Sequence, residues 1–390
     1  MEGHTNHSGR GPLPRIPGMS VPGIDDDFCM THPQPRNTRG LPDAETTLAW
    51  GELATRSKAP PFLHPGWLGC WWPAFGTGEL EIKGLWRQGE LIAALSLGRR
   101  PGQVESTANF HTPVFGIVAA DPSAARSMAR ELFRDAPPQV SLTGLDPDGL
   151  TFKVCKDAAE EAGFSVITRP HLLSPYAEME YGWNEYKRNL HSHLLRNLRR
   201  GRKQLEEQGQ LVVEIVSGGA LLDTWLDEAM QVEASGWKGK LGTAIKSRPH
   251  TEGFYRKMTH WAAERGVLKL YLLRHAGRVL TMCLTLQQHG VCYMLKGGYD
   301  ENFRRYSPGN ILTEALLEDC ASHGIRRVEI YGEAEAYKMN WATGTSQYLR
   351  LEAFAPTTSG RLAQAAYRYG RPITSRVRQA LRMQQPGHRQ

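Results

Sequence analysis

The sequence lacks three features that would each assign a class of protein by themselves. No apolar run approaches the roughly 20 residues that a transmembrane helix needs, and no signal peptide opens the chain. The six cysteines among 390 residues are scattered, without a C-x-x-C pair, and the histidines do not cluster. We therefore expect reduced thiols, a cytoplasmic location and no bound metal.

Length and charge set the next bounds. A chain of 390 residues with 40% hydrophobic residues and ten tryptophans has enough material for two domains with sizeable cores. Its formal net charge of +7 is compatible with an anionic partner. Nucleotide phosphate, nucleic acid and an anionic membrane all fit that description.

Composition and periodicity divide the chain into four segments. Residues 1–45 are rich in Gly, Pro, His and Asp and have no hydrophobic period, which predicts a disordered leader. Residues 46–179 and 180–355 mix strand and helix patterns and form two α/β units. Residues 356–390 contain arginines but no acidic residue. This basic tail is predicted to be a terminal helix, either solvated or lying on a membrane or RNA.

The first unit is predicted to be a compact α/β domain in which no group of residues forms a catalytic or binding motif. Residues 62–75 predict a short helix whose tryptophans pack on a core, and residues 80–86 and 91–97 predict a hairpin turning at 87–90. Helices are expected at 123–133 and 151–162, with a strand at 140–144 between them.

The second unit opens with a predicted long helix at 183–208 and continues to a three-strand meander. The helix carries a basic face. This face either binds an anionic partner, namely phosphate or an acidic membrane surface, or is simply solvated. That face consists of Arg196, Arg199, Arg200 and Lys203. Residues 268–274, 279–286 and 291–295 predict antiparallel strands joined by short turns, and strands are expected at 328–331 and 348–354.

The joint after the meander has the pattern of an anion site. An apolar strand leads to a basic loop with Arg304 and Arg305, and then to Ser307-Pro308-Gly309, where Ser307 suits a helix cap and Pro308 the first helical position. The start of a helix presents free N–H groups and a positive dipole, which suit a pyrophosphate.

Three short motifs in order resemble one known family. They are Glu233-Ala-Ser-Gly-Trp237-Lys238-Gly239, Tyr299-Asp300 followed by Tyr306-Ser307-Pro308-Gly309, and Tyr337-Lys338-Met339-Asn340-Trp341. Their order resembles the CelD/BcsL branch of the GNAT acyltransferase superfamily, described as cellulose-biosynthesis acetyltransferases. The resemblance implies an α/β (α+β) fold of two tandem GNAT-like domains related to the FemAB transferases, each a mixed, mostly antiparallel sheet flanked by helices.

By this resemblance the protein is an enzyme that moves an acyl group from acetyl-CoA or another acyl-CoA to an amine. The acceptor would be a small molecule or an envelope or polysaccharide precursor, and no metal takes part. The residues implied to bind the CoA thioester are Met294, Leu295, Lys296, Gly297, Arg304, Arg305, Ser307, Gly309 and Asn310. The candidates for proton transfer are Asp300, Glu333, Glu335, Tyr306 and Tyr337, and no single base is chosen. The acceptor side is expected to comprise Trp237, Lys238, Tyr299, Lys338 and Trp341.

Two other functions fit the same residues. A FemAB-like transferase would take its acyl group from aminoacyl-tRNA, with the basic helix face following RNA phosphates. A non-catalytic GNAT-fold binding protein is the third interpretation. In either case the basic tail is a possible peripheral membrane contact.

Overall fold

Both helices and strands occur throughout residues 33–369, the range that this computed structural model describes. The N-terminal half (residues 33–178) contains β1 Gln34–Arg39, α2 Ala44–Arg56, η1 Pro61–Leu63, α3 Pro65–Phe75, β2 Glu79–Arg87, β3 Glu90–Arg100, β4 Gln103–Ser106, β5 Val118–Ala119, α4 Pro122–Arg134, β6 Gln139–Leu145, α5 Leu150–Glu161 and β7 Ser165–Glu178. The C-terminal half (residues 179–354) contains α6 Trp183–Arg188, α7 Ser192–Glu206, β8 Leu211–Val216, α8 Leu222–Ser235, α9 Trp237–Lys240, η2 Ile245–Ser247, α10 Pro249–Glu264, β9 Leu268–His275, β10 Arg278–Gln288, β11 Val291–Tyr299, η3 Glu301–Tyr306, α11 Pro308–Ser322, β12 Arg327–Ile330, α12 Ala336–Met339 and β13 Gly344–Phe354. A helix at 358–369 follows β13.

One mixed sheet of 13 strands runs through both halves of the described chain. Its order is β1-β2-β3-β4-β6-β13-β7-β12-β11-β10-β9-β8, with β5 beside β3. Each half contributes an antiparallel meander followed by one parallel pair, β4 with β6 and β11 with β12. The helix that crosses between the parallel strands is α4 in the first half and α11 in the second. The two halves therefore repeat the same strand order about the middle of the sheet.

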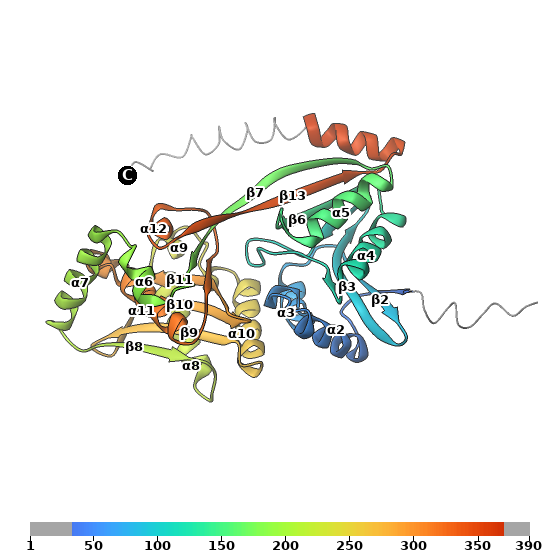
Figure 1. Cartoon of the computed structure of the whole chain (residues 1–390). Helices are drawn as coiled ribbons and strands as arrows, with labels where there is room; N and C mark the ends of the chain where they lie inside the picture. Colours follow the sequence, from blue (N-terminus) through green and yellow to red (C-terminus); the bar gives the residue numbers. More distant parts are fainter. Residues whose placement is uncertain (1–32, 370–390) are drawn as a thin grey trace, which may run out of the picture.

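The last strand of each half lies in the middle of the sheet and reaches toward the other half. β7 pairs with β12, and β13 pairs with β6 over Leu349–Phe354, while β7 and β13 pair with each other. Figure 1 shows these two long strands bridging the halves. The division at 179/180 predicts that residues 348–354 close the sheet of the second unit. They complete the first unit instead, because Leu351 and Ala353 lie in its core.

The two halves also share a hydrophobic core. The core around α2 and α3 continues into α8, α10 and the meander of the second half. The Trp67 ring meets the rings of Phe254 and Trp261 at centroid distances of 5.4 and 6.2 Å. A Cβ atom on Gly66 would lie 2.0 Å from Trp261 Nε1, so only glycine permits this approach of α3 to α10. The tryptophans predicted to fill the core of the first unit form part of the joint between the units.

Local patterns predict the turns well. β2 and β3 form the expected hairpin, and Gln88 and Gly89 at its tip have φ angles of 53° and 79°. The meander β9, β10 and β11 is antiparallel as predicted.

Two local predictions are wrong. Residues 34–39 of the predicted disordered leader form β1, which pairs with β2; residues 1–32 lie outside the described residues. The single helix predicted for 183–208 is two helices, α6 and α7, separated by extended backbone at His191. The apolar spacing continues across this break, so periodicity does not register it.

Candidate functional site

A divergence of two parallel strands organises the C-terminal half. β11 pairs with β12 only from Val291 to Met294, yet β11 continues to Tyr299. One residue of β11, Leu295, bulges out of its ladder with β10, because Leu284 faces Lys296 and Thr285 faces Met294. Beyond Met294 the two strands separate, and the backbone of Leu295–Gly297 is no longer paired with β12. The bulge and the separation coincide with residues 294–297, which the family resemblance implies to bind the CoA thioester.

A pocket of about 340 Å³ lies on the α7/α11 face of this half. It is lined by His191, Ser192, His193, Leu194, Asn197, Leu198, Ser307, Asn310 and Asn340. The predicted residues Ser307 and Asn310 therefore share a pocket with the start of α7, whose contribution is not predicted from the sequence.

Two helix N-termini open into this pocket without a side-chain cap. Neither His191 before α7 nor Ser307 before α11 makes a side-chain cap hydrogen bond. Within the described residues, the backbone N–H groups of Ser192, His193 and Leu194 have no hydrogen-bond acceptor, and neither has that of Gly309. Three of these N–H groups, those of Ser192, His193 and Leu194, belong to residues that line the pocket, and the starts of two helices meet there, an arrangement that suits phosphate groups.

A glycine sets the position of α7. A Cβ atom on Gly201 would lie 2.2 Å from the carbonyl oxygen of Tyr306. The helix therefore packs directly on the backbone of η3, the turn that leads into Ser307. This contact brings the starts of α7 and α11 to the same pocket.

Asn310 is oriented by a buried tryptophan. Trp341 Nε1 donates a hydrogen bond of 3.1 Å to Asn310 Oδ1, and the Trp341 carbonyl accepts one from the Tyr186 hydroxyl. With its oxygen held, the Asn310 amide presents its N–H₂ group as a donor to the pocket. Trp341 is 2% exposed, so its expected place on the acceptor surface is wrong, and it acts by positioning Asn310.

The corresponding helix of the N-terminal half has an occupied N-terminus. Asp121 Oδ1 accepts a hydrogen bond of 2.8 Å from Ala124 N at the start of α4. A carboxylate already satisfies this helix end and would repel a phosphate. The open, uncapped arrangement belongs to α11.

The two predicted arginines lie in η3, immediately before Ser307, and neither lines the pocket. The Arg305 guanidinium lies over the Tyr306 ring, 4.5 Å from its centroid, and contacts its hydroxyl. Arg304 is exposed. Gly309 has room for a side chain, since the nearest atom to a Cβ at this position would be Tyr299 Cδ1, at 3.9 Å.

Two of the predicted proton-transfer residues have structural partners instead. Asp300 is 2% exposed; its carboxylate is ion-paired with Arg278 and accepts a hydrogen bond from Asn302 N. Tyr306 is 4% exposed, and its hydroxyl is hydrogen-bonded to the Gln208 amide. Neither is placed to exchange a proton with a substrate.

The other three candidates lie on the loop around α12. Glu333 and Glu335 are exposed, and Lys338 Nζ pairs with Glu335 at 3.0 Å and donates to the Glu333 carbonyl. The Tyr337 ring is 57% exposed, yet partial desolvation and Glu335 raise the pKa of its phenol. Tyr337 is thus a protonated donor at neutral pH.

The predicted acceptor-side residues do not form one group among the described side chains. Tyr299 ends β11 near the start of α11, whereas the Lys338 ammonium is engaged by its own loop. The side chains of Trp237 and Lys238 lie outside the described part of the structure.

Sequence reasoning missed Glu329, a buried carboxylate on β12. Tyr293 is its register partner on β11, so Glu329 lies on the sheet face opposite Cys292 and Met294 and away from the pocket. Its Oε1 accepts a hydrogen bond of 2.6 Å from Arg327 Nε, while Oε2 is buried without a partner among the described residues. Burial raises the pKa of Glu329, and burial with this neighbouring carboxylate raises the pKa of Tyr293. A charged residue flanked by Val328 and Ile330 in a strand is the signal that would have identified it.

The same face carries a polar contact between the halves. Lys296 Nζ lies 4.9 Å from the ring centroid of Phe110 and 5.8 Å from that of Tyr255. His111 Nδ1 is 3.0 Å from the Tyr255 hydroxyl, and burial together with Lys296 lowers the pKa of His111 to about 3. The imidazole is therefore neutral, and the loop carrying Phe110 and His111 brings the first half to the end of β11.

Comparisons with known proteins agree with this architecture. Residues 192–339 match the family model described as Acetyltransferase (GNAT) domain. No curated protein matches the chain in sequence. The narrower CelD/BcsL assignment stays a prediction.

Solved structures resemble the chain over both halves. The C-terminal domain (DUF2156) of a putative lysylphosphatidylglycerol synthetase from Agrobacterium fabrum has a TM-score of 0.53 and 11% identity, covering 83% of this chain and 96% of that one. FemX has a TM-score of 0.54 and 12% identity, covering 81% and 96%. A tandem GNAT protein from the clavulanic acid biosynthesis pathway has a TM-score of 0.47 and 11% identity, covering 83% and 100%. At these identities the likeness concerns the fold alone, and the predicted mixed α/β fold is confirmed, with a strand order that repeats in the two halves.

Two further findings concern the described residues alone. None of their helices is long and apolar enough to cross a bilayer. They contain no group of three or more His, Cys, Asp or Glu side chains arranged to hold a metal ion.

Proposed function

We propose that the chain is an acyltransferase whose C-terminal half carries the reaction, moving an acyl group from a CoA thioester to a primary amine. The acceptor is the amine of a small molecule or a cell-envelope precursor. The observation that carries the proposal is the convergence of two uncapped helix N-termini, α7 and α11, on one pocket beside the divergence of β11 and β12. That pocket offers N–H donors to the pyrophosphate, and the unpaired stretch of β11 is the path for the thioester arm.

The chemistry takes place on the opposite face of the sheet from the pocket. The neutral amine attacks the thioester carbonyl and forms the new C–N bond, and negative charge develops on the carbonyl oxygen. The C–S bond then breaks, and the thiolate leaves. Glu329 accepts the proton that the amine must lose, because its raised pKa makes it a stronger base than an exposed carboxylate. The Lys296 ammonium, 8% exposed on the same side of the sheet, supplies positive charge toward the developing oxyanion.

The test places a negative charge at the start of α11. Ser307 has a φ angle of 53°, a left-handed conformation that Asp and Asn adopt readily. Ser307→Asp should leave the melting temperature unchanged or slightly raised, because a carboxylate suits a helix N-terminus. The same charge should weaken CoA binding by about 10-fold or more, measured by isothermal titration calorimetry.

The matched control is Ser307→Asn, which has nearly the same shape without the charge. We expect it to bind CoA within about threefold of the wild type, or about 0.7 kcal/mol. Equal CoA affinity of the Asp variant and the wild type would remove this pocket from the donor site. Equal losses in both variants would show that shape, rather than charge, matters there.

A second donor, aminoacyl-tRNA, is favoured by one specific observation. The basic face of α7 is exposed beside the same pocket, and Arg196, Arg199 and Arg200 have no ion-pair partner among the described residues. Both donors would use the same catalytic half and the same sheet divergence. Only the tRNA donor needs the exposed basic face, so the salt dependence of tRNA binding separates them.

A further inference from the structure

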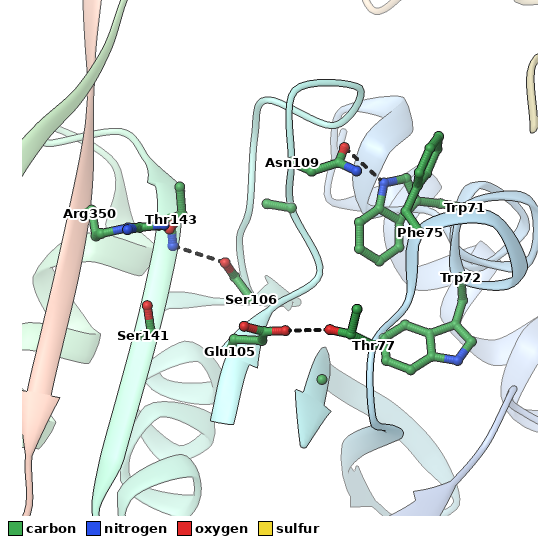
Figure 2. Close-up of a pocket in the computed structure, with 12 residues that line it drawn as sticks. Trp71, Trp72, Phe75, Thr77, Glu105, Ser106, Asn109, Ser141, Thr143 and Arg350 are labelled. Atoms are coloured by element: carbon green, nitrogen blue, oxygen red, sulfur yellow. Dashed lines mark hydrogen bonds between the residues drawn. The ribbon is translucent and has the colours of Figure 1, made fainter. Parts of the chain in front are cut away.

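A second pocket, of about 120 Å³, lies in the N-terminal half at the divergence of its own parallel strands. β4 pairs with β6 from Gln103 to Glu105, and β6 continues beyond this pairing to Leu145. At the point of separation the Thr143 amide donates to the Ser106 hydroxyl at 2.9 Å rather than to a backbone carbonyl. Figure 2 shows the pocket between these strands and α3.

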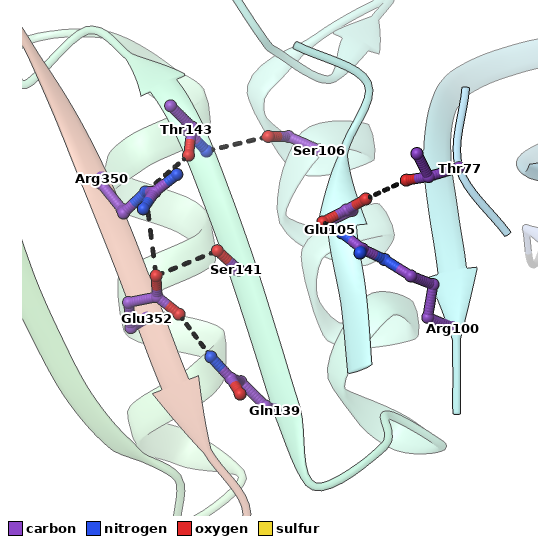
Figure 3. Close-up of polar contacts among 9 residues, drawn as sticks. All are labelled: Thr77, Arg100, Glu105, Ser106, Gln139, Ser141, Thr143, Arg350 and Glu352. Carbon is purple, nitrogen blue, oxygen red and sulfur yellow. Dashed lines mark hydrogen bonds and ion pairs between the residues drawn. The ribbon is translucent and has the colours of Figure 1, made fainter. Parts of the chain in front are cut away.

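The floor of the pocket is polar although it is a buried sheet face. Leu142 and Leu351 point into the core on the α4/α5 side, so their neighbours on β6 and β13 face the pocket. These neighbours are Ser141, Thr143 and Arg350, with Glu352 below them. Glu352 is 2% exposed, and its carboxylate accepts hydrogen bonds from Ser141 Oγ at 3.0 Å and Gln139 Nε2 at 2.9 Å (Figure 3).

Arg350 is held in a fixed orientation at the edge of this floor. Its Nε donates to Thr143 Oγ1 at 2.8 Å and lies 3.8 Å from a Glu352 oxygen (Figure 3). Its two terminal nitrogens have no hydrogen-bond acceptor among the described residues, and its side chain is 29% exposed. A guanidinium anchored through Nε and open at its far edge can bind a carboxylate through two parallel hydrogen bonds.

Other donors around the pocket are also unused. Ser106 and Thr143, 7% exposed each, accept hydrogen bonds through their oxygens, and neither hydroxyl hydrogen has an acceptor in the described part of the chain. Asn109 Oδ1 accepts from Trp71 Nε1 at 3.1 Å, which leaves the Asn109 N–H₂ group available. The acidic Glu105 is already bound by Thr77 and Arg100. The unused hydrogen-bonding groups described here are therefore donors, and they suit a ligand with several acceptor atoms.

An aromatic wall faces this polar floor. It consists of Trp71, Trp72 and Phe75, all from α3. In Figure 2 the three rings lie across the pocket from Arg350, Thr143 and Ser141. A flat apolar group placed between floor and wall would contact the rings while a planar anion at its other end met Arg350.

We propose that this pocket is a binding site for a small carboxylic acid with a flat apolar body. The carboxylate accepts hydrogen bonds from the outer edge of the Arg350 guanidinium and from the neighbouring hydroxyl groups, and the apolar body lies against the aromatic wall. The site goes beyond the transferase proposal and does not depend on it.

The probe is benzoate, the simplest molecule with both features, titrated calorimetrically into the full chain. We expect saturable binding of benzoate at concentrations up to about 10 mM, and no saturation with benzamide, which has the same shape without the charge. Arg350→Gln should weaken benzoate binding by about 10- to 100-fold, the range for a hydrogen bond to a charged group. Arg87→Gln removes the same charge at an exposed position outside the pocket and is the matched control, which should bind benzoate as the wild type does.

A second variant keeps the proposal testable if Arg350→Gln does not fold. Arg350→Gln leaves the buried Glu352 without its nearest cation, so its melting temperature must be compared with that of the wild type. Thr143→Val keeps the side-chain volume and leaves the Glu352 and Arg350 charges unchanged, but it removes one hydroxyl donor and the acceptor of the Arg350 Nε hydrogen bond. It should weaken benzoate about 10-fold. The proposal is overturned if the wild type shows no saturable benzoate binding, if benzamide binds equally well, or if folded Thr143→Val binds benzoate like the Arg87→Gln control.

Discussion

A methyl group on Gly201 should separate α7 from the turn that leads into α11. A Cβ atom there would lie 2.2 Å from the Tyr306 carbonyl oxygen and 3.1 Å from its carbon, and the obstacle is backbone, which cannot rotate away. Relief requires a shift of roughly 1 Å, and such overpacking costs about 1–3 kcal/mol. The higher helix propensity of alanine offsets about 1 kcal/mol of this. Because the clash is with backbone, we take the upper end of this cost, about 3 kcal/mol. After the offset, Gly201→Ala should lower the free energy of unfolding by about 2 kcal/mol.

The same substitution at Gly253 is the control, because it also lies in a helix, α10, but a Cβ there meets no atom within 4 Å. Gly253→Ala should therefore raise the free energy of unfolding by about 0.5–1 kcal/mol. Urea unfolding gives both values, provided that the slope m is unchanged. Gly201→Ala should in addition weaken CoA binding, because the three free N–H groups of α7 move with the helix. A Gly201 variant as stable as the Gly253 variant would refute the close contact that places the start of α7 at the pocket.

The remaining predictions concern the base and the donor. Glu329→Gln should reduce kcat by about 10²- to 10⁴-fold while leaving CoA affinity unchanged. Since the pKa of Glu329 is raised above its ordinary value, the wild-type rate should fall as the pH falls through that raised pKa. This loss of rate at low pH should be absent from the Glu329→Gln variant. If the variant keeps the same pH dependence, another group is the base. Replacing the basic face of α7 with glutamine should leave turnover with a CoA thioester nearly unchanged. If tRNA is the donor, the same replacement should weaken tRNA binding and reduce its salt slope by roughly three units, at about 0.7 to 0.9 per phosphate contact, as measured at several salt concentrations. The four positions are Arg196, Arg199, Arg200 and Lys203.

Features encoded by neighbouring residues could be predicted from the sequence. The hairpin at Gln88-Gly89, the three-strand meander and the strand–loop–helix joint at Ser307 each depend on residues close together in the chain. The sequence also indicates that the start of α11 is an anion site. It does not indicate that α7 supplies a second helix end, because Gly201 meets the Tyr306 carbonyl through a contact between distant residues.

The chemical roles of the carboxylates were harder to predict for a similar reason. Asp300 stands beside the predicted site in the sequence, but its charge is neutralised by Arg278, 22 residues away. Glu329 lies in a short apolar strand, and its importance appears once β12 is placed beside β11 and the aromatic residues around it. The sequence suggested three acids, Asp300, Glu333 and Glu335, without choosing among them, and burial in the folded sheet favours a fourth.

The exchange of β7 and β13 between the halves has a consequence for synthesis. Ser141 of β6 and Glu352 of β13 are hydrogen-bonded partners that are 211 residues apart in the chain. At about 5–20 residues per second, a ribosome takes roughly 10 to 40 seconds to add the missing strand after β6 has emerged. Throughout that interval one edge of β6 has no neighbour, and the anchored arginine of the second pocket has not yet been made. The first half to be translated is therefore among the last parts of the molecule to be completed, and a nascent chain stalled before residue 344 would present an open sheet edge to chaperones or to other chains.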